Sequence, residues 1–527
     1  MMNALRCFVT AALALATISA RAQEATGAGA VTIDVKSAAY GCKGDARTND
    51  TACFQKAAKA IRDAGGGTLL IPRGTYIVGE QQFAGATAQG YSYRGVDTTG
   101  TGYRNIIDIA DTTAPVSIVG FGARLQWAQG LKYGFFNPVT GEPEAPSPHN
   151  AAQPAGTPGK EVGAGMIVVR NTAAPVTIEG LELDGNVSGF VFNAGVEIQL
   201  WAVNLAVVNA AQVTVRDVHT HHSPHDGLYV GYSGRKATDP DTPTLLEDVR
   251  SEYNSRLDLA WTGGNGLTAI RCTFAYAGSN GYITTGPASN LDIEVEFAQS
   301  LARGRFIDCH FIHVAPSPML YNGWNVAAVT GASSDVVFEG CTFENYSNDT
   351  VVVNRIRYKF VDCRFYGRVN AGPADAAGGL SAEDSIVFQD SYFDDRPHPI
   401  HGAPYGDYLF RTDTVTALGG MVIDGCTFVA NARGSIFLRF PGSRELATVR
   451  NTRVHHAWRP ADADRQHALF ENVALENVAF TDTGADFVPG RQYGVRGTTL
   501  PGGHVRVSGT DVVWSPRREA ATASARR

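Results

Sequence analysis

Phe306-Ile-Asp-Cys309-His-Phe311 is the stretch that decides the fold, because its pattern returns along most of the chain. The pattern is an apolar residue, two variable residues, a small residue, one variable residue and a second apolar residue. Full or partial copies begin at Ile178, Val215, Phe338, Phe360, Phe388, Ile423, Val449 and Leu475. Repetition at roughly 20 to 40 residues indicates a stack of equivalent units, each burying its apolar face against the next. The sequence therefore predicts an all-β solenoid.

The small position of this pattern, called here the small slot, is often cysteine. Five cysteines occupy it: Cys272, Cys309, Cys341, Cys363 and Cys426. Other copies carry Leu181, Val218, Ser391, Thr452 or Val478 at the same place. Because apolar and hydroxyl residues replace cysteine there, we interpret these thiols as buried spacers and not as metal ligands.

The first 22 residues have the composition of a secretory signal peptide. Arg6 precedes an apolar run over 8–18, and Ala20-Arg21-Ala22 follows as a small-residue cleavage pattern. This pattern predicts export to the periplasm or out of the cell. In an oxidising compartment, Cys42 and Cys53, which flank a short loop, are expected to form a disulfide.

Charge limits the classes of partner. The chain carries a formal net charge of -7, whereas nucleic acids and anionic membranes favour a basic surface. No later stretch has the roughly 18 uncharged apolar residues that a membrane helix needs. We therefore expect neither nucleic acid nor membrane as a partner.

Residues 31–80 form a distinct N-terminal cap motif. A strand is predicted at 31–35, followed by a helix with Asp50 or Thr51 as its N-cap and with Gly65-Gly-Gly67 as its stop signal. A second strand follows at 68–72. A short amphipathic helix here would cover the open end of the stack, whose unpaired edges otherwise invite aggregation.

This opening also resembles a known family. Tyr40-Gly-Cys-Lys-Gly-Asp-Ala-Arg-Thr-Asn-Asp-Thr-Ala-Cys-Phe-Gln55, followed by Gly65-Gly-Gly-Thr-Leu-Leu-Ile-Pro-Arg-Gly-Thr-Tyr76, is similar to the start of pectate-lyase-like superfamily proteins. The resemblance implies a single-stranded right-handed parallel β-helix over 23–514 that acts on or binds a polysaccharide or oligosaccharide, as a monomer or a homotrimer. The scaffold carries several chemistries, so it does not fix the reaction. Residues 131–165 are expected to be a Pro- and Gly-rich surface insertion, and 515–527 a disordered tail.

A second strand series precedes several of the repeats, at 195–200, 227–231, 258–262 and 290–294. Aligning their apolar positions places Glu197, Tyr229, Ala260 and Asp292 in one row, at spacings of 32, 31 and 32 residues. Alternate strand residues point to opposite faces, so we expect this row to point outward into solvent. The regular spacing predicts three successive turns of the coil.

Acidic side chains gather on this predicted wall and favour glycoside hydrolysis. Two neighbouring carboxyl groups can divide the work of general acid and general base, and crowding raises the pKa of one of them. The expected catalytic residues are Asp226, Asp258, Asp292 and Glu294. The expected substrate-binding residues are Glu197, His225, Tyr229 and Arg256. Hydrolysis of this kind requires no cofactor.

Two other hypotheses about the function stay open. Ser223-Pro-His-Asp226 resembles the Asp-Pro-His motif of alginate C5-epimerases, with serine in the first position. A lyase or epimerase would use His225 or Tyr229 for proton transfer, Arg256 against the substrate carboxylate, and Ca²⁺ as a bridging ion. The third reading is a non-catalytic glycan-binding or adhesin-like β-helix.

Four histidines, His219, His221, His222 and His225, crowd into seven residues. Zinc sites combine spaced pairs with a further ligand at closing geometry, which the sequence does not fix here. We therefore assign no metal site from the sequence.

Overall fold

The structure is a computed structural model. It describes residues 31–83, 93–102, 104–134, 136, 142–143, 165–193, 201–282, 288–313, 326–328, 331–372, 384–395, 408–412, 421–430, 436–439, 447–456, 468–471, 473–482, 493–496, 506–507 and 512–515. The predicted signal peptide, most of the insertion at 131–165, Glu197 and all but the first residue of the C-terminal tail lie outside these ranges.

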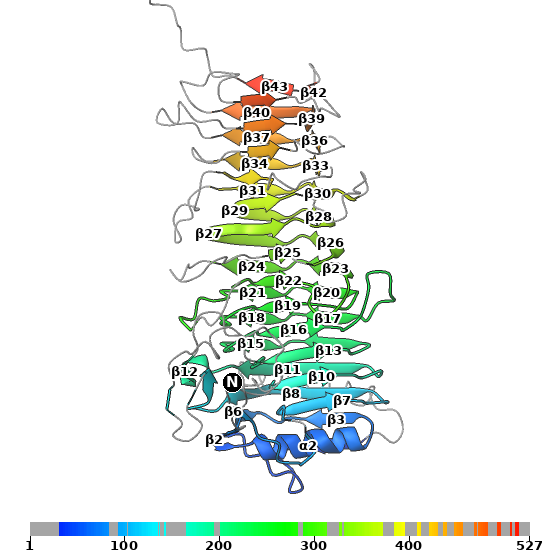
Figure 1. Ribbon diagram of the computed structural model, residues 1–527, viewed down its shortest axis with the longest axis vertical. Coiled ribbons are helices and arrows are strands. Elements are labelled where there is room, and N and C mark those ends of the chain that lie inside the picture. The colour runs from blue at the N-terminus through cyan, green and yellow to red at the C-terminus, as the bar shows by residue number, and fades with distance from the viewer. Residues whose placement is uncertain are drawn as a thin grey trace, which may run out of the picture. The chain divides into compact units, whose positions relative to one another are not determined.

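The chain divides into two compact units, unit 1 (Met1–His225) and unit 2 (Asp226–Arg527). In each unit, short strands pair in parallel with strands one turn later, which confirms the predicted parallel β-helix (Figure 1). In unit 1, for example, Val31, Gly67, Val116 and Val176 are successive partners in one ladder.

In its described part, unit 1 contains one α-helix, one short 3-10 helix and fifteen of the named strands. They are α2 (Thr51–Asp63), η1 (Val187–Gly189), β1 (Val31–Asp34), β2 (Asp45–Asn49), β3 (Gly67–Leu70), β4 (Gly74–Val78), β5 (Gln81–Phe83), β6 (Tyr93–Gly95), β7 (Ile107–Ala110), β8 (Val116–Trp127), β9 (Lys132–Gly134), β10 (Ile167–Arg170), β11 (Val176–Asp184), β12 (Val191–Asn193), β13 (Leu205–Val208), β14 (Val213–Arg216) and β15 (His219–His221).

In the described part of unit 2 the named elements are strands. They are β16 (Leu228–Gly231), β17 (Thr244–Glu247), β18 (Arg250–Glu252), β19 (Leu259–Trp261), β20 (Leu267–Ile270), β21 (Thr273–Ala275), β22 (Leu291–Ile293), β23 (Leu301–Ile307), β24 (His310–His313), β25 (Val326–Ala328), β26 (Ser333–Glu339), β27 (Thr342–Val353), β28 (Ile356–Val361), β29 (Arg364–Ala371), β30 (Ile386–Gln389), β31 (Tyr392–Asp394), β32 (Phe410–Arg411), β33 (Met421–Asp424), β34 (Thr427–Ala430), β35 (Ile436–Arg439), β36 (Ala447–Arg450), β37 (Arg453–His456), β38 (Ala468–Glu471), β39 (Val473–Glu476), β40 (Val478–Asp482), β41 (Tyr493–Arg496), β42 (Arg506–Val507) and β43 (Val512–Ser515).

The predicted capping helix is α2, which packs against β1, β3 and β7 of unit 1 (Figure 1). Its apolar face is fully buried, as Phe54 and Ile61 show. Asp50 occupies the N-cap position, but its side chain does not cap the helix. Instead its carboxylate accepts hydrogen bonds from the backbone N–H groups of Lys43 (2.7 Å) and Gly44 (2.9 Å).

That loop is also closed covalently, since Cys42 and Cys53 form a disulfide with Cα atoms 5.4 Å apart. The bond ties the first turn of α2 to the loop that precedes it, so the disulfide and Asp50 fix the same turn.

Two ladders of stacked phenylalanines fill the core of unit 2. Phe306, Phe338, Phe360 and Phe388 stack with ring centroids 4.8, 4.9 and 4.8 Å apart. Phe311, Phe343, Phe365, Phe393 and Phe428 form the second ladder at 5.0, 4.9, 4.7 and 4.4 Å. These are the two apolar positions of the repeat, and their spacing is that of adjacent strands. Each fully buried ring contributes on the order of 2 to 3 kcal/mol.

The residue before the small slot adopts a left-handed conformation in copy after copy, with φ between 50° and 76°. Glycine, aspartate and asparagine enter this region most readily, and they hold nearly all of these places: Gly180, Asp217, Asp248, Asp308, Gly340, Asp362, Asp390, Gly425, Asn451 and Asn477. Arg271 is the exception. The repeat is thus a corner between two strands. This left-handed corner explains why aspartate, asparagine and glycine occur inside the repeat.

The small slot faces inward at this corner, as predicted. Its five cysteines are buried and free, and each thiol donates to a carbonyl oxygen of the preceding turn, as Cys341 Sγ does to Phe306 (3.3 Å). Ser391 makes the same contact through its hydroxyl, to Phe360 at 3.4 Å. The slot therefore accepts a small donor as well as an apolar residue.

Replacing Cys341 tests this arrangement. Cys341→Asp buries a charge without a partner and should lower the free energy of unfolding by roughly 3–5 kcal/mol. Cys341→Ser keeps a donor for the Phe306 carbonyl and should cost only about 1 kcal/mol. Urea denaturation followed by circular dichroism measures both. Equal losses in the two variants would contradict the proposed role of the slot.

Candidate functional site

Three successive turns of unit 2 build the candidate site, on β16, β19 and β22. Leu228, Leu259 and Leu291 are partners in register, and so are Tyr229, Ala260 and Asp292. The alignment deduced from the sequence is therefore confirmed for these three turns (Figure 1). Trp261, which alternates with Ala260 along β19, is fully buried.

The predicted exposure of these side chains to bulk water is wrong. Tyr229 is 7% exposed and Asp292 4%, while Asp226 and Asp258 are fully buried. Of the predicted catalytic residues, Glu294 is the one that reaches solvent, with 30% of its side chain exposed. Asp226, Asp292 and Glu294 lie around a buried cation.

That cation is Arg256, whose side chain is only 4% exposed. Its Nη1 lies 3.1 Å from Asp226 Oδ2, and its Nη2 lies 3.9 Å from Glu294 Oε2. Asp226 Oδ1 also accepts a hydrogen bond from the backbone N–H of Leu257 at 3.2 Å. A buried ion pair is tolerated only when such further hydrogen bonds satisfy the charges. Asp226 and Arg256 therefore hold each other.

Asp292 lies beside this pair and has a strongly raised pKa. Burial raises its pKa, the charge on Glu294 raises it further, and Arg256 only partly opposes them, so that the pKa is about 8. A carboxyl group in this state carries its proton at neutral pH. The site thus holds a protonated acid two residues before the more exposed Glu294.

Glu296 also lies in this site, although it is not among the residues predicted from the sequence. Its Oε2 accepts a hydrogen bond from the Tyr229 hydroxyl at 2.9 Å, and Thr262 donates to that same hydroxyl at 2.8 Å. Burial raises the pKa of Glu296, against the Tyr229 hydrogen bond. The signal was the alternation of Asp292, Glu294 and Glu296, which continues past the end of the predicted strand. We call Asp226, Tyr229, Arg256, Asp292, Glu294 and Glu296 the arginine-centred cluster.

Asp258 lies in a different environment from the exposed one that was predicted. One carboxyl oxygen accepts from Asn254 Nδ2 at 2.7 Å, while Oδ2 has no hydrogen-bond partner in the described structure. Burial raises its pKa well above the ordinary value. One turn later the corresponding corner holds Asn290, whose amide donates to the Ile312 carbonyl at 2.8 Å. Asp258 is therefore a buried corner residue, which the outward assignment overlooked.

Two other predicted residues do not enter the cluster as described. His225 is the last residue of unit 1 and is buried there, with its backbone N–H 3.3 Å from Ser223 Oγ. Glu197 lies outside the described residues.

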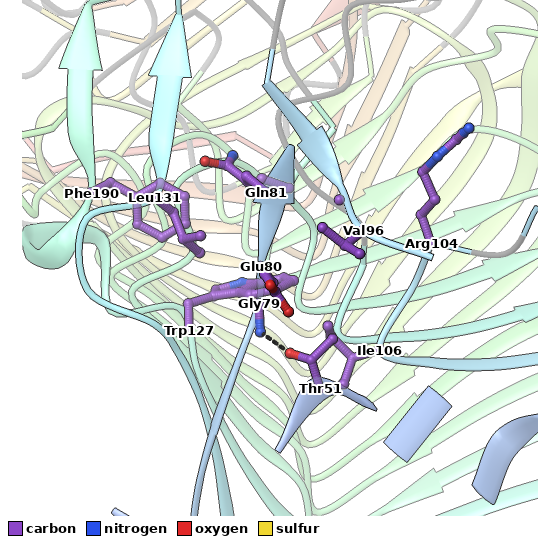
Figure 2. Close-up of a pocket in the computed structure, with 12 residues that line it drawn as sticks. Thr51, Gly79, Glu80, Gln81, Val96, Arg104, Ile106, Trp127, Leu131 and Phe190 are labelled. Carbon is purple, nitrogen blue, oxygen red and sulfur yellow. Dashed lines mark hydrogen bonds between the residues drawn. The ribbon is translucent and has the colours of Figure 1, made fainter. Parts of the chain in front are cut away.

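Unit 1 contains a separate small pocket, shown in Figure 2. Leu131 and Phe190 lie on one side of it and Val96 and Ile106 on the other. At its edge, the Gly79 N–H donates to the Thr51 hydroxyl at 2.7 Å. The lining is largely apolar, and its one acidic residue, Glu80, is not among the predicted acids.

Comparison with known proteins gives similarity in fold alone. No family model and no curated protein matches the chain. Among solved structures, the chain is similar to the A-module of the Azotobacter vinelandii mannuronan C-5 epimerase AlgE6 (TM-score 0.44, 12% identity, covering 91% of this chain and 97% of that one). The AlgE4 A-module matches with TM-score 0.40 and 12% identity, over 92% and 100% of the two chains.

A phage protein matches at the same level. The tailspike of Escherichia coli bacteriophage HK620, solved with a pentasaccharide, gives a TM-score of 0.40 at 11% identity, over 84% of this chain and 74% of that one. Such distant similarity does not bear on activity. A search of the described residues for a helix of the length and hydropathy needed to cross a membrane gives no candidate.

The raised pKa of Asp292 makes stability depend on pH. The folded state favours its protonated form, so its contribution is complete below about pH 4 and is lost as pH rises toward 8. Asp292→Asn removes this loss. One pKa unit corresponds to about 1.4 kcal/mol. From pH 4.5 to pH 8 the free energy of unfolding of the variant should therefore rise by a few kcal/mol relative to that of the wild type. Urea titrations at both pH values measure this, and parallel pH profiles would contradict the assignment.

Proposed function

We propose that this protein is an exported carbohydrate-active enzyme that hydrolyses glycosidic bonds of a polysaccharide or oligosaccharide at the arginine-centred cluster. The observation that carries the proposal is a carboxyl group kept protonated at neutral pH, Asp292, beside a partly exposed carboxylate on the same strand, Glu294. Glycoside hydrolysis needs this division between an acid and a base or nucleophile.

The two groups lie on the same side of one strand. Residues two apart on a strand share a face, with Cα atoms roughly 7 Å from each other. Glu294 continues the ladder of β22, because its backbone N–H donates to the Trp261 carbonyl at 3.1 Å. A sugar bound on that face would meet both carboxyl groups, as glycoside hydrolysis requires.

Each residue of the cluster then has a role. Asp292 donates its proton to the leaving oxygen, and Glu294, which reaches solvent, activates the attacking water. Arg256 positions Glu294, and Asp226 holds Arg256 from the buried side. Tyr229 and Glu296 form a hydrogen-bonded pair at the wall of the same site.

Charge favours a neutral or mixed glycan over a strongly acidic one. Even with Asp292 protonated, Asp226, Glu294 and Glu296 outnumber the single Arg256, whose guanidinium is already paired with Asp226. A lyase or C5-epimerase must neutralise the carboxylate of its substrate, and here that would require a bridging Ca²⁺. Hydrolysis asks for no such group.

A polysaccharide panel tests the reaction class. Reducing ends without ultraviolet absorbance from unsaturated uronate indicate hydrolysis, whereas both signals together indicate a lyase. Binding of a glycan without either signal indicates a binding module and would refute the proposal.

Asp292→Asn tests the proposed acid. The substitution should lower the rate of hydrolysis by 10²- to 10⁴-fold, the usual contribution of a general acid. Asp248→Asn is the matched control, because Asp248 is 41% exposed and has a left-handed φ of 55° that asparagine also adopts. It should keep wild-type activity. Full activity in a folded Asp292→Asn protein would remove Asp292 from the mechanism.

A further inference from the structure

Three side chains of types that bind metal ions lie close together in unit 1. None of them belongs to the arginine-centred cluster. They are Asp184, His221 and His222, and one ligand atom from each lies within 4.8 Å of the other two. His221 Nδ1 is 2.8 Å from His222 Nδ1 and 3.6 Å from Asp184 Oδ1. In a tetrahedral zinc site with bonds of about 2.0–2.1 Å, neighbouring ligand atoms are separated by similar distances.

The coil places these residues through its register. Asp184 ends β11 and His221 ends β15, and the two are direct partners in the parallel ladder between those strands. Side chains at partner positions of parallel strands point to the same face. His222 follows at a corner, with φ 51°, which turns the chain immediately after His221.

A carboxylate behind His221 fixes its orientation. Glu182, on the same face of β11, has Oε1 3.2 Å from His221 Nε2. With Nε2–H donated to Glu182, the lone pair of His221 lies on Nδ1, on the side of Asp184 and His222. Histidines that bind metals characteristically donate their other N–H to a carboxylate in this way. The outer partner is therefore present together with the three ligands.

The local charges also favour a cation. Asp184 and Glu182 supply two negative charges against the one positive charge of Arg124, which pairs with Asp184 Oδ2 and has its Nε 3.4 Å from Glu182 Oε1, so one negative charge is in excess. Asp184 Oδ1 accepts one hydrogen bond, from the Asn186 N–H at 2.8 Å, and keeps a second lone pair. The side chains of Asp184 and His221 are 7% and 11% exposed, so a bound ion would be largely shielded from water.

We propose that Asp184, His221 and His222 bind one divalent transition metal ion, Zn²⁺ by the chemistry of the donors. Two imidazoles and one carboxylate suit zinc better than calcium or magnesium, which prefer oxygen ligands alone. When the ion binds, the proton that His222 Nδ1 shares with His221 moves to its other ring nitrogen or to solvent. Three protein ligands leave a fourth position for water.

Direct metal titration of the full chain tests the site. Protein freed of metal with a chelator is titrated with Co²⁺, whose tetrahedral complexes absorb visible light, and with Zn²⁺ by calorimetry. We expect one ion per chain, with Zn²⁺ displacing Co²⁺. Glu182→Gln should weaken binding by 10- to 100-fold, as loss of an outer-shell partner does.

His222→Asn is the decisive ligand variant, because asparagine keeps the left-handed corner while losing the imidazole. It should abolish the Co²⁺ spectrum and weaken Zn²⁺ binding by at least 100-fold. His310→Ala is the control, since His310 also faces a carboxylate, with Nε2 2.8 Å from Glu344, but should leave binding unchanged. Absence of binding in the wild type, or equal binding by folded His222→Asn, would overturn the proposal.

Discussion

The left-handed corner before the small slot is the constraint on which both units depend. Each turn of the coil must bend at that corner and still keep its next strand in register with the neighbouring turn. Asp308 and Gly340 meet the backbone requirement in neighbouring turns, and the thiol of Cys341 then satisfies a carbonyl of the turn before. Once the corner is fixed, the flanking phenylalanines fall at the strand spacing and stack. Local backbone geometry, a buried donor and aromatic packing therefore all select the same register, which is the consistency expected of a foldable sequence.

The arginine-centred cluster departs from this uniformity. A position that holds Ala260 in one turn holds Asp292 in the next, although burying an acid costs free energy that alanine does not. Arg256 and Asp226 offset one another, yet Asp292 keeps a pKa far from its ordinary range. Perturbed carboxyl groups are enriched at functional sites, and structural ion-pair networks also perturb pKa values. The regular scaffold holds the cluster rigidly, because the side chains of the cluster come from three successive turns.

Much of the fold could be predicted from the sequence, because period and alternation follow directly from strand geometry. The partners Tyr229, Ala260 and Asp292 follow from the alignment of apolar positions and from the regular spacing, and the observed register confirms them. Burial was not predictable in the same way. Alternation says which side of a strand a side chain occupies, but not what lies over that side, and so Asp292 was expected in water. The pairing of Arg256 with Asp226 joins residues 30 positions apart. Glu296 lies past the end of the predicted strand, and only the continued alternation of acidic residues pointed to it. Asp258 shows a further limit, since it was expected in water and is fully buried, with one carboxyl oxygen bonded to Asn254.

The free cysteines of unit 2 give the coil a set of internal reporters. Burial raises the pKa of the Cys341 thiol well above its ordinary value, and a protonated, enclosed sulfur does not react with alkylating reagents. Because one such thiol stands in each of several turns, from Cys272 to Cys426, alkylation records which turns have opened. The mass and position of the label would then distinguish a coil that frays from one end from a coil that melts as a whole.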